Sequence, residues 1–236
     1  MVGVNRYLAV LSDLPPENWD AYLAENSGLP GPRTNLALAD AFAAVASRDV
    51  IVEHANSSDE YLRFCGTQGL GMALAADPRD TTLLAILRQR ASDESWRVRE
   101  GAARGLQFVG DARPDLLCSF AAHWLGDTDP YVRRAAIAAL CEPRLLVNEA
   151  VWQCAMMSCI VATASIAHVP VDVRKEPGLR NLRQALGYCW SVVVAAAPER
   201  GLAEFEKLRA SIDPDVQWIV RSNLTKARLR SVMDQA

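Results

Sequence analysis

The sequence predicts an all-α fold, a right-handed α-solenoid of about five stacked helix pairs. The main observation is a repeat: the stretches 93–106 and 127–140 each place an acidic turn before a Val-Arg pair, small residues and a leucine. Val98 and Val132 lie 34 positions apart. A period of this length with helical content is typical of stacked helix pairs. Half of the 236 residues are apolar, which is enough for a continuous core between the pairs.

The first 58 residues are predicted to form an irregular helical cap. Residues 1–60 are acidic, with 3 basic and 9 acidic side chains, and residues 1–15 show only a short apolar patch. Pro16 suits the first turn of a helix, and Thr34 or Asn35 suits an N-cap. Glycine and proline in residues 27–33 predict a loop. Helices are therefore expected over residues 17–25, 34–46 and 48–55.

Residues 59–236 are predicted to form one continuous solenoid domain of repeated units. Each unit contains a partner helix, a short acidic turn and a second helix. The pattern loosens after Leu140 and returns near the end, where Val216 and Leu224 keep the eight-residue spacing of Val98 and Leu106. Residues 169–178 are expected to be a linker because they contain two prolines and a glycine. Helices between the turns are expected over residues 80–91, 113–125, 145–166, 179–194 and 198–208.

The repeated pattern accounts for this structure in physical terms. Val98, Ala102 and Leu106 are four positions apart and share one helical face, and the central alanine lets neighbouring helices approach closely. The glycines of residues 66–71 are interpreted in the same way, as close-packing positions inside a helix rather than a phosphate-binding loop. Acidic side chains just before a helix start can accept hydrogen bonds from its free amides. Three acids are expected in this role: Asp93, Asp129 and Asp215.

No motif for catalysis, a metal or a cofactor is evident. His54, His123 and His168 are scattered, and no cysteine pair has C-x-x-C spacing. Serine hydrolase, zinc protease and P-loop signatures are missing from the sequence. The six cysteines are expected to be buried free thiols. No metal and no cofactor are therefore expected.

Charge and hydropathy give weak guidance about surroundings. The net charge of −3 provides no general attraction to nucleic acid or anionic lipid. The most apolar stretch, residues 151–169, includes five polar side chains, so a buried helix is predicted there rather than a membrane span. The N-terminal residues do not resemble a signal peptide. A cytoplasmic location without membrane association is expected.

The stretches 96–106 and 130–140 resemble HEAT repeats, whose pattern is an acidic turn followed by V-R-x-x-A-x-x-x-L. The resemblance covers residues 59–141 well and residues 176–228 loosely. The segments E-N-S-G-L-P-G-P-R and D-P-D-V-Q-W-I-V-R-S-N-L look like those of a group of bacterial HEAT-repeat proteins. Such proteins are scaffolds whose second helices line a concave binding surface.

The stretches 115–136 and 180–216 are also similar to the AlkD-like DNA alkylation-repair proteins, which are HEAT-like glycosylases. This resemblance implies that Arg134 matches their arginine, that Tyr188 stands where one tryptophan is expected and that Trp96 is near the other. Their carboxylate has no clean match, because its position falls near Glu100 and Gly101. The resemblance implies duplex DNA binding, or excision of an alkylated base, as an alternative function.

The favoured function is that of a non-enzymatic scaffold that holds an acidic protein segment on an arginine-lined concave face. Arginine recurs at one position of each repeat, as Arg63, Arg99 and Arg133. A structural role remains an alternative for these three, in which each bridges to an acidic residue of a turn. Aromatic side chains beside arginine suit both protein partners and nucleic acid. The predicted partner-binding residues are Trp96, Arg99, Arg133, Arg134, Arg180, Arg183, Tyr188, Trp218 and Arg221.

Overall fold

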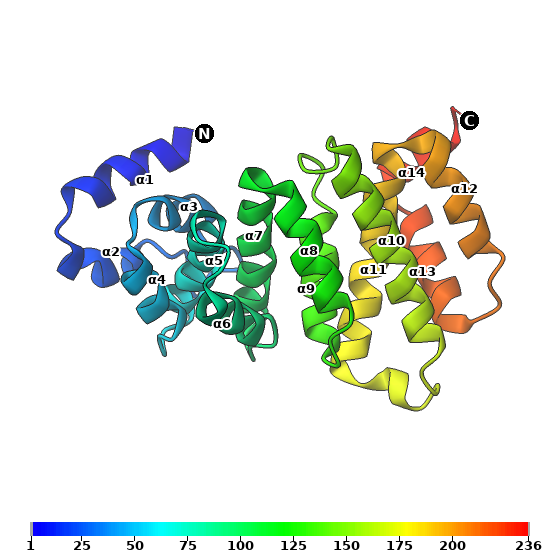
Figure 1. Ribbon diagram of the computed structural model, residues 1–236, viewed down its shortest axis with the longest axis horizontal. Helices are drawn as coiled ribbons and strands as arrows, with labels where there is room; N and C mark the ends of the chain where they lie inside the picture. Colours follow the sequence, from blue (N-terminus) through cyan, green and yellow to red (C-terminus); the bar gives the residue numbers. More distant parts are fainter. Residues whose placement is uncertain (1, 236) are drawn as a thin grey trace. The chain divides into compact units, whose positions relative to one another are not determined.

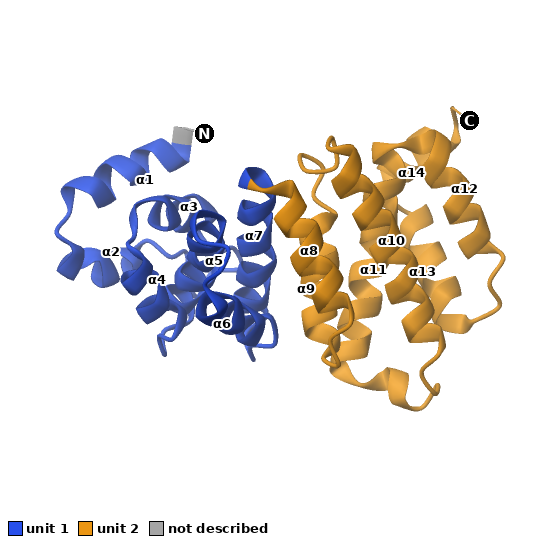
Figure 2. Ribbon diagram, in the orientation of Figure 1, with its two compact units in different colours: residues 1–112 blue, residues 113–236 orange. Residues whose placement is uncertain are grey.

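The computed structural model describes residues 2–235, which contain α-helices and two short 3-10 helices but no strand (Figure 1). The predicted all-α class is confirmed. The helices group into two compact units, residues 1–112 and residues 113–236 (Figure 2). The proposed division into a cap of residues 1–58 and a solenoid of residues 59–236 stays a prediction beside this grouping.

Unit 1 begins with a helix over residues whose sequence showed only a short apolar patch. The predicted helix of residues 17–25 is split between a 3-10 turn and a short α-helix. Its elements are α1 (Val2–Asp13), η1 (Pro16–Asn18), α2 (Trp19–Glu25), α3 (Leu36–Val45), α4 (Arg48–Ala55), α5 (Glu60–Ala76), α6 (Thr81–Ala91) and α7 (Trp96–Ala112).

Unit 2 contains the remaining helices, and the predicted linker of residues 169–178 includes a short 3-10 helix. Its elements are α8 (Pro114–Leu125), α9 (Pro130–Leu140), α10 (Glu149–Ala167), η2 (Val173–Lys175), α11 (Pro177–Ala196), α12 (Pro198–Arg209), α13 (Pro214–Leu224) and α14 (Ala227–Met233).

The helices of the described chain form the five predicted pairs: α4/α5, α6/α7, α8/α9, α10/α11 and α12/α13. In unit 1 the second helix α5 packs along the second helix α7. In unit 2 the second helix α11 packs against both α9 and α13 (Figure 1). A helix pair alone leaves one apolar face uncovered, and packing against the next pair buries it. Val98, Ala102 and Leu106 are fully buried, as this arrangement requires.

Acidic caps begin several helices, and two of the three expected roles need correction. Asp129 caps α9 as predicted, by accepting a hydrogen bond from the Tyr131 amide at 2.8 Å. Asp93 instead lies two residues before Ser95, whose hydroxyl oxygen accepts the hydrogen bond from the helix amide of Arg97. Asp215 is not a cap, since Asp213 caps α13 and Asp215 is its second residue. Pro214 allows the helix to begin two residues before the predicted position.

Glycine permits backbone-to-backbone contact where helices cross. A Cβ atom at Gly71 of α5 would overlap the carbonyl oxygen of Gly105 in α7. A Cβ atom at Gly66 would likewise overlap the backbone of Ala55 in α4. The glycines of residues 66–71 therefore serve helix packing, as predicted.

Among the described residues, α10 is the one helix that is both long and strongly apolar. By length and composition α10 could cross a membrane, but half of its most apolar window is buried within the protein. Met157 and Val161 remain exposed on its outer side. Trp19, Trp124 and Trp152 are buried. Four cysteines are buried as expected, whereas Cys118 and Cys154 are half-buried.

We expect Gly71→Ala to lower the free energy of unfolding by about 2–3 kcal/mol or more, because the α5–α7 crossing has no room for a methyl group. The matched control is Gly126→Ala in the turn after α8, where a Cβ atom would meet only the His123 carbonyl oxygen at an ordinary 3.5 Å. Urea unfolding of both variants measures the difference. Equal midpoints for the two variants would contradict the assigned role of Gly71.

Candidate functional site

The repeated arginines of unit 1 close the turns that precede their own helices. The Nη1 atom of Arg63 donates to the carbonyl oxygens of Ser57 and Ser58, at 2.9 and 3.1 Å. One repeat later, Nη1 of Arg99 donates to the carbonyl oxygens of Asp93 and Glu94, at 2.6 and 2.9 Å. The same geometry in both repeats shows that these guanidinium groups are used to hold the backbone of the turn.

Asp93 joins two repeats through a buried carboxylate. Arg63 donates to it from the preceding second helix at 3.1 Å, and Arg90 of α6 donates to it at 3.1 Å. The amide of Ser95 donates to its other oxygen at 2.9 Å. Because the Asp93 side chain is only 5% exposed, these donors replace the water that it loses on folding. Arg63 therefore has the structural role that was the alternative to ligand binding.

The second helix α7 of unit 1 carries two half-buried arginines that already have acidic partners. Arg97 lies 3.4 Å from Glu60 and also donates to the carbonyl oxygen of Gly31 at 3.2 Å. Arg104 lies 2.6 Å from Asp40 and donates to Gln68 at 2.9 Å. The sequence did not single out Arg97 or Arg104, because their partners lie 37 and 64 positions away along the chain.

Trp96 is the most exposed of the predicted aromatic residues. It begins α7 with 53% of its surface exposed, and the guanidinium of Arg97 lies 4.8 Å from the centre of its ring. Trp96 and Arg99 belong to unit 1, whereas the other predicted binding residues belong to unit 2. Trp96 and Arg99 are therefore described apart from them.

The second helices of unit 2 differ in charge from those of unit 1. The helices α9, α11 and α13 carry five arginines (Arg133, Arg134, Arg180, Arg183 and Arg221) and one acidic residue, Asp215. Arg180 and Arg221 are exposed and make no ion pair with any residue in the described range 2–235. The unpaired charges of Arg180 and Arg221 produce a local positive potential on α11 and α13.

Asp215 balances one of these arginines, Arg183, and leaves Arg180 and Arg221 without its charge. It is 8% exposed and forms ion pairs with Arg183 and, at 3.2 Å, with Arg174. Arg174 lies in the predicted linker but is buried, and it donates to the carbonyl oxygens of Val169 and Ala167, both at 2.7 Å. Its Nη1 atom also donates to Asp213 at 2.6 Å. The network therefore fastens residues 167–174 to the start of α13.

Hydrogen bonding in this network changes the pKa of one carboxyl. Burial alone would raise the pKa of Asp213. The hydrogen bonds from Arg174 and from the amides of Val216 and Asp215 outweigh that effect and hold the pKa below its usual value. Asp213 therefore keeps its negative charge near neutral pH, and the cap of α13 remains intact.

Two predicted aromatic residues of unit 2 carry stacked arginines. The guanidinium of Arg183 lies 4.7 Å from the centre of the Trp218 ring. The guanidinium of Arg228 lies 4.6 Å from the centre of the Tyr188 ring, and its Nη2 atom donates to the Tyr188 hydroxyl at 2.8 Å. Stacking holds a guanidinium plane in place while leaving its edges able to bind a carboxylate. Arg228 was not among the residues predicted from the sequence.

The two neighbouring arginines of α9 have different surroundings. Arg133 is half-buried and its Nη1 atom donates to Ser165 of α10 at 3.2 Å. Burial lowers the pKa of Arg133, and the charges of Asp127 and Asp129 partly offset this effect. Arg134 follows it on the helix and is also half-buried. Arg133 therefore contributes to packing between α9 and α10.

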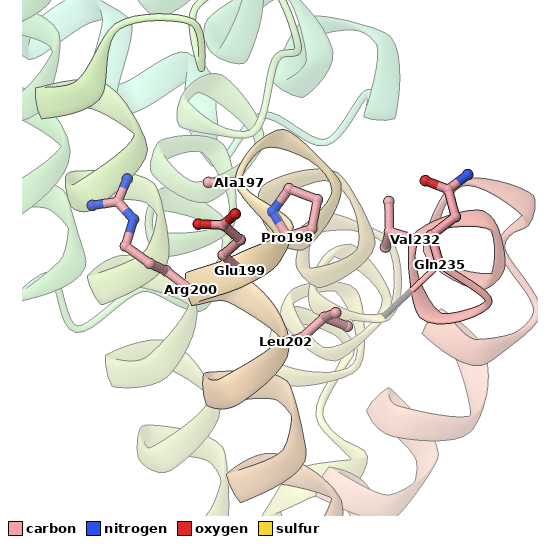
Figure 3. A pocket seen from close by; sticks show the side chains of 7 residues that line it. All are labelled: Ala197, Pro198, Glu199, Arg200, Leu202, Val232 and Gln235. Atoms are coloured by element: carbon pink, nitrogen blue, oxygen red, sulfur yellow. The ribbon is translucent and has the colours of Figure 1, made fainter.

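The hollows of unit 2 do not resemble a catalytic centre. One, of about 510 Å³, lies beside the start of α12 and the end of α14 (Figure 3). Its Arg200 already contacts both oxygens of Glu149 at 2.7 Å and lies over the Trp152 ring. Within residues 2–235, no three His, Cys, Asp or Glu side chains gather in a way that could hold a metal ion.

We expect Asp93→Ala to lower the free energy of unfolding by about 3 kcal/mol, because Arg63 and Arg90 would lose a shared partner in a mostly buried site. Glu94→Ala is the matched control, since the Glu94 side chain is 92% exposed. Its cost should stay within about 0.5 kcal/mol. Chemical denaturation measures both, and a cost for Asp93→Ala as small as that of the control would contradict the structural role.

Comparison with known proteins supports the repeat. The family described as HEAT repeats matches residues 48–141, which include the helices α4 to α9. No curated protein sequence matches the chain. The AlkD-like resemblance and a bacterial origin have no support in these comparisons and stay predictions.

Several solved structures of engineered repeat proteins are similar over most of the chain. One engineered protein is 17% identical and covers 97% of each chain, with a TM-score of 0.35. A designed armadillo repeat protein is 14% identical and covers 85% of this chain and 96% of its own, with a TM-score of 0.30. Another, determined in complex with the peptide (KR)4, is 13% identical over 86% of this chain and 97% of its own, with a TM-score of 0.33. The chain has an all-helical repeat fold, and residues 48–141 match the family described as HEAT repeats.

Proposed function

We propose that this protein is a binding scaffold that holds an acidic protein segment on the second helices of unit 2. The surface, called the arginine face, consists of Arg180, Tyr188, Trp218, Arg221 and Arg228. One observation carries the proposal: Arg180 of α11, Arg221 of α13 and Arg228 of α14 make no ion pair with any acidic residue in the described range 2–235. Asp215, the acidic residue of α13, is already held by Arg183 and Arg174. An acidic ligand would supply the missing negative charge.

The contrast with unit 1 limits the proposal to unit 2. In unit 1, Arg97 and Arg104 also lie on a second helix, α7, but they form ion pairs with Glu60 and Asp40. An acidic ligand would have to compete with these carboxylates. The free energy lost when the existing ion pair breaks would offset the free energy gained from the new pair. Trp96 and Arg99 are accordingly left out of the proposed face.

The chemistry of the face suits carboxylates on a peptide. Arginine binds a carboxylate through two parallel N–H groups, and this geometry is stronger and more specific than a single contact. Tyr188 is 44% exposed and offers apolar surface beside Arg228. Arginine with tyrosine and tryptophan is the composition that contributes most energy at protein interfaces.

The test is binding of a fluorescein-labelled peptide of ten residues that contains five glutamates, followed by fluorescence anisotropy. We expect Arg180→Glu/Arg221→Glu to weaken binding at least about tenfold, because two attractive charges become repulsive. Both side chains are exposed, so the unfolding midpoint should not change. Affinity for the peptide should also fall as salt is raised from about 50 to about 300 mM, because the Debye length shortens over this range and the charges are screened.

The matched control is Arg79→Glu/Lys207→Glu, which makes the same change in net charge at exposed positions outside the arginine face. It should retain peptide binding within about twofold, since only general attraction is altered. Equal losses in the two double variants would contradict a defined face. A plain DNA duplex that binds more tightly than the peptide, with the same loss in Arg180→Glu/Arg221→Glu, would favour the nucleic-acid alternative instead.

A further inference from the structure

A shallow apolar hollow adjoins the arginine face in unit 2. It measures about 450 Å³, and its walls come from the turn after α9 (Leu146 and Val147), the last turns of α11 (Val192 and Ala195) and Arg228 of α14. Val147 is 87% exposed at its rim, although a valine side chain gains from burial. The hollow therefore presents apolar surface that the described chain leaves open to water.

The single charged side chain of this hollow is a cation. Arg228 makes no ion pair with any acid within residues 2–235, and its guanidinium is fixed by stacking on Tyr188 and by the hydrogen bond to the Tyr188 hydroxyl. An apolar cavity with one fixed cation at its edge matches an apolar group that has a carboxylate nearby. Charge complementarity thus points to the same kind of ligand as the arginine face.

The hollow continues the exposed row of α11. Arg180, Gln184 and Tyr188 are exposed at successive four-residue steps, so they lie in a row on one side of the helix. Tyr188 contacts Arg228, which lines the hollow. From Arg180 to Val192 the helix rises by roughly 18 Å, at 1.5 Å for each residue. An extended peptide covers that distance in about five or six residues.

We propose that the hollow binds one apolar side chain of the acidic segment, about five or six residues from a carboxylate bound by Arg180. This inference rests on the proposed function and gives it a sequence rule: glutamate or aspartate at one end and a leucine-like residue at the other. The arginines supply attraction and orientation. The hollow supplies selection among acidic segments, because only a segment with the apolar residue at this spacing fills it.

The experiment compares three fluorescein-labelled peptides of twelve residues on the full chain, each made in both chain directions. The first has two glutamates at one end and a leucine six residues away, in a Gly/Ser background. The second replaces the leucine with serine, and the third moves the leucine next to the glutamates. We expect the first peptide, in one direction, to bind about tenfold more tightly than the other two.

Val147→Asp tests the hollow itself, since it puts a negative charge at the rim and its exposed position leaves the fold intact. We expect it to reduce the preference for the leucine peptide over the serine peptide to less than about twofold. Val171→Asp is the matched control, because Val171 is 61% exposed in the segment before η2 and outside the hollow. This variant should keep the preference for the leucine peptide. The ratio of the affinities for the leucine and serine peptides is compared because it removes any general effect of the added charge.

The outcomes separate this inference from the proposed function. If all three peptides bind wild-type protein equally and Arg180→Glu/Arg221→Glu weakens all of them, the arginine face stands and the hollow has no part in binding. A preference for leucine that survives Val147→Asp would also overturn the inference. At 50 mM salt the Debye length is ~14 Å, so charges are only weakly screened. If no peptide binds under these conditions, both proposals fail.

Discussion

The close approach of neighbouring second helices is the constraint on which the repeat structure depends. A helix pair leaves an apolar face uncovered, and only direct packing against the next pair removes this face from water. Gly71 and Gly105 show how tight the contact is, since a single methyl group would overlap the backbone across the crossing. Buried alanines such as Ala102 and Ala136 have the same consequence at a smaller scale. Side chains at helix positions outside this packed face are then held on the surface of the repeat, whatever their chemistry.

Arginine has two different uses on this framework. In unit 1, Arg63 and Arg99, which follow Leu62 and Val98, face the turn and satisfy backbone carbonyl groups. These groups would otherwise lack partners at the point where the chain reverses. The arginines that project from the second helices have no such duty, and their state depends on the acids around them. Unit 1 supplies acids to Arg97 and Arg104, whereas Arg180 and Arg221 of unit 2 make no ion pair in the described range 2–235. The proposed binding surface depends on this difference rather than on a special motif.

Local features of the fold could be predicted from the sequence because they depend on neighbouring residues. Helices begin at caps and end at glycine-proline turns. Ser47 caps the start of α4, Asp80 caps the start of α6, and the apolar spacing that follows each cap indicates the helix. The arginine network could not be predicted, because Arg174 and Asp215 are 41 positions apart and meet only in the folded chain. For the same reason the sequence grouped Trp96 and Arg99 with residues of unit 2. The repeat identifies equivalent positions in the sequence. It does not identify the residue that each one contacts, because that residue can lie far away along the chain.

Under the proposed function, the contacts that hold arginines in unit 2 would lower the entropic cost of binding a ligand. Arg183 is held between Asp215 and the Trp218 ring, and Arg228 is held by Tyr188. A flexible arginine loses about 2 kcal/mol of side-chain entropy when it is immobilised, and that loss opposes binding. Where stacking has already fixed the guanidinium, folding has met this cost before a ligand arrives. Exposed Arg180 and Arg221 would then add charge, while the stacked residues provide the fixed geometry that distinguishes one acidic segment from another.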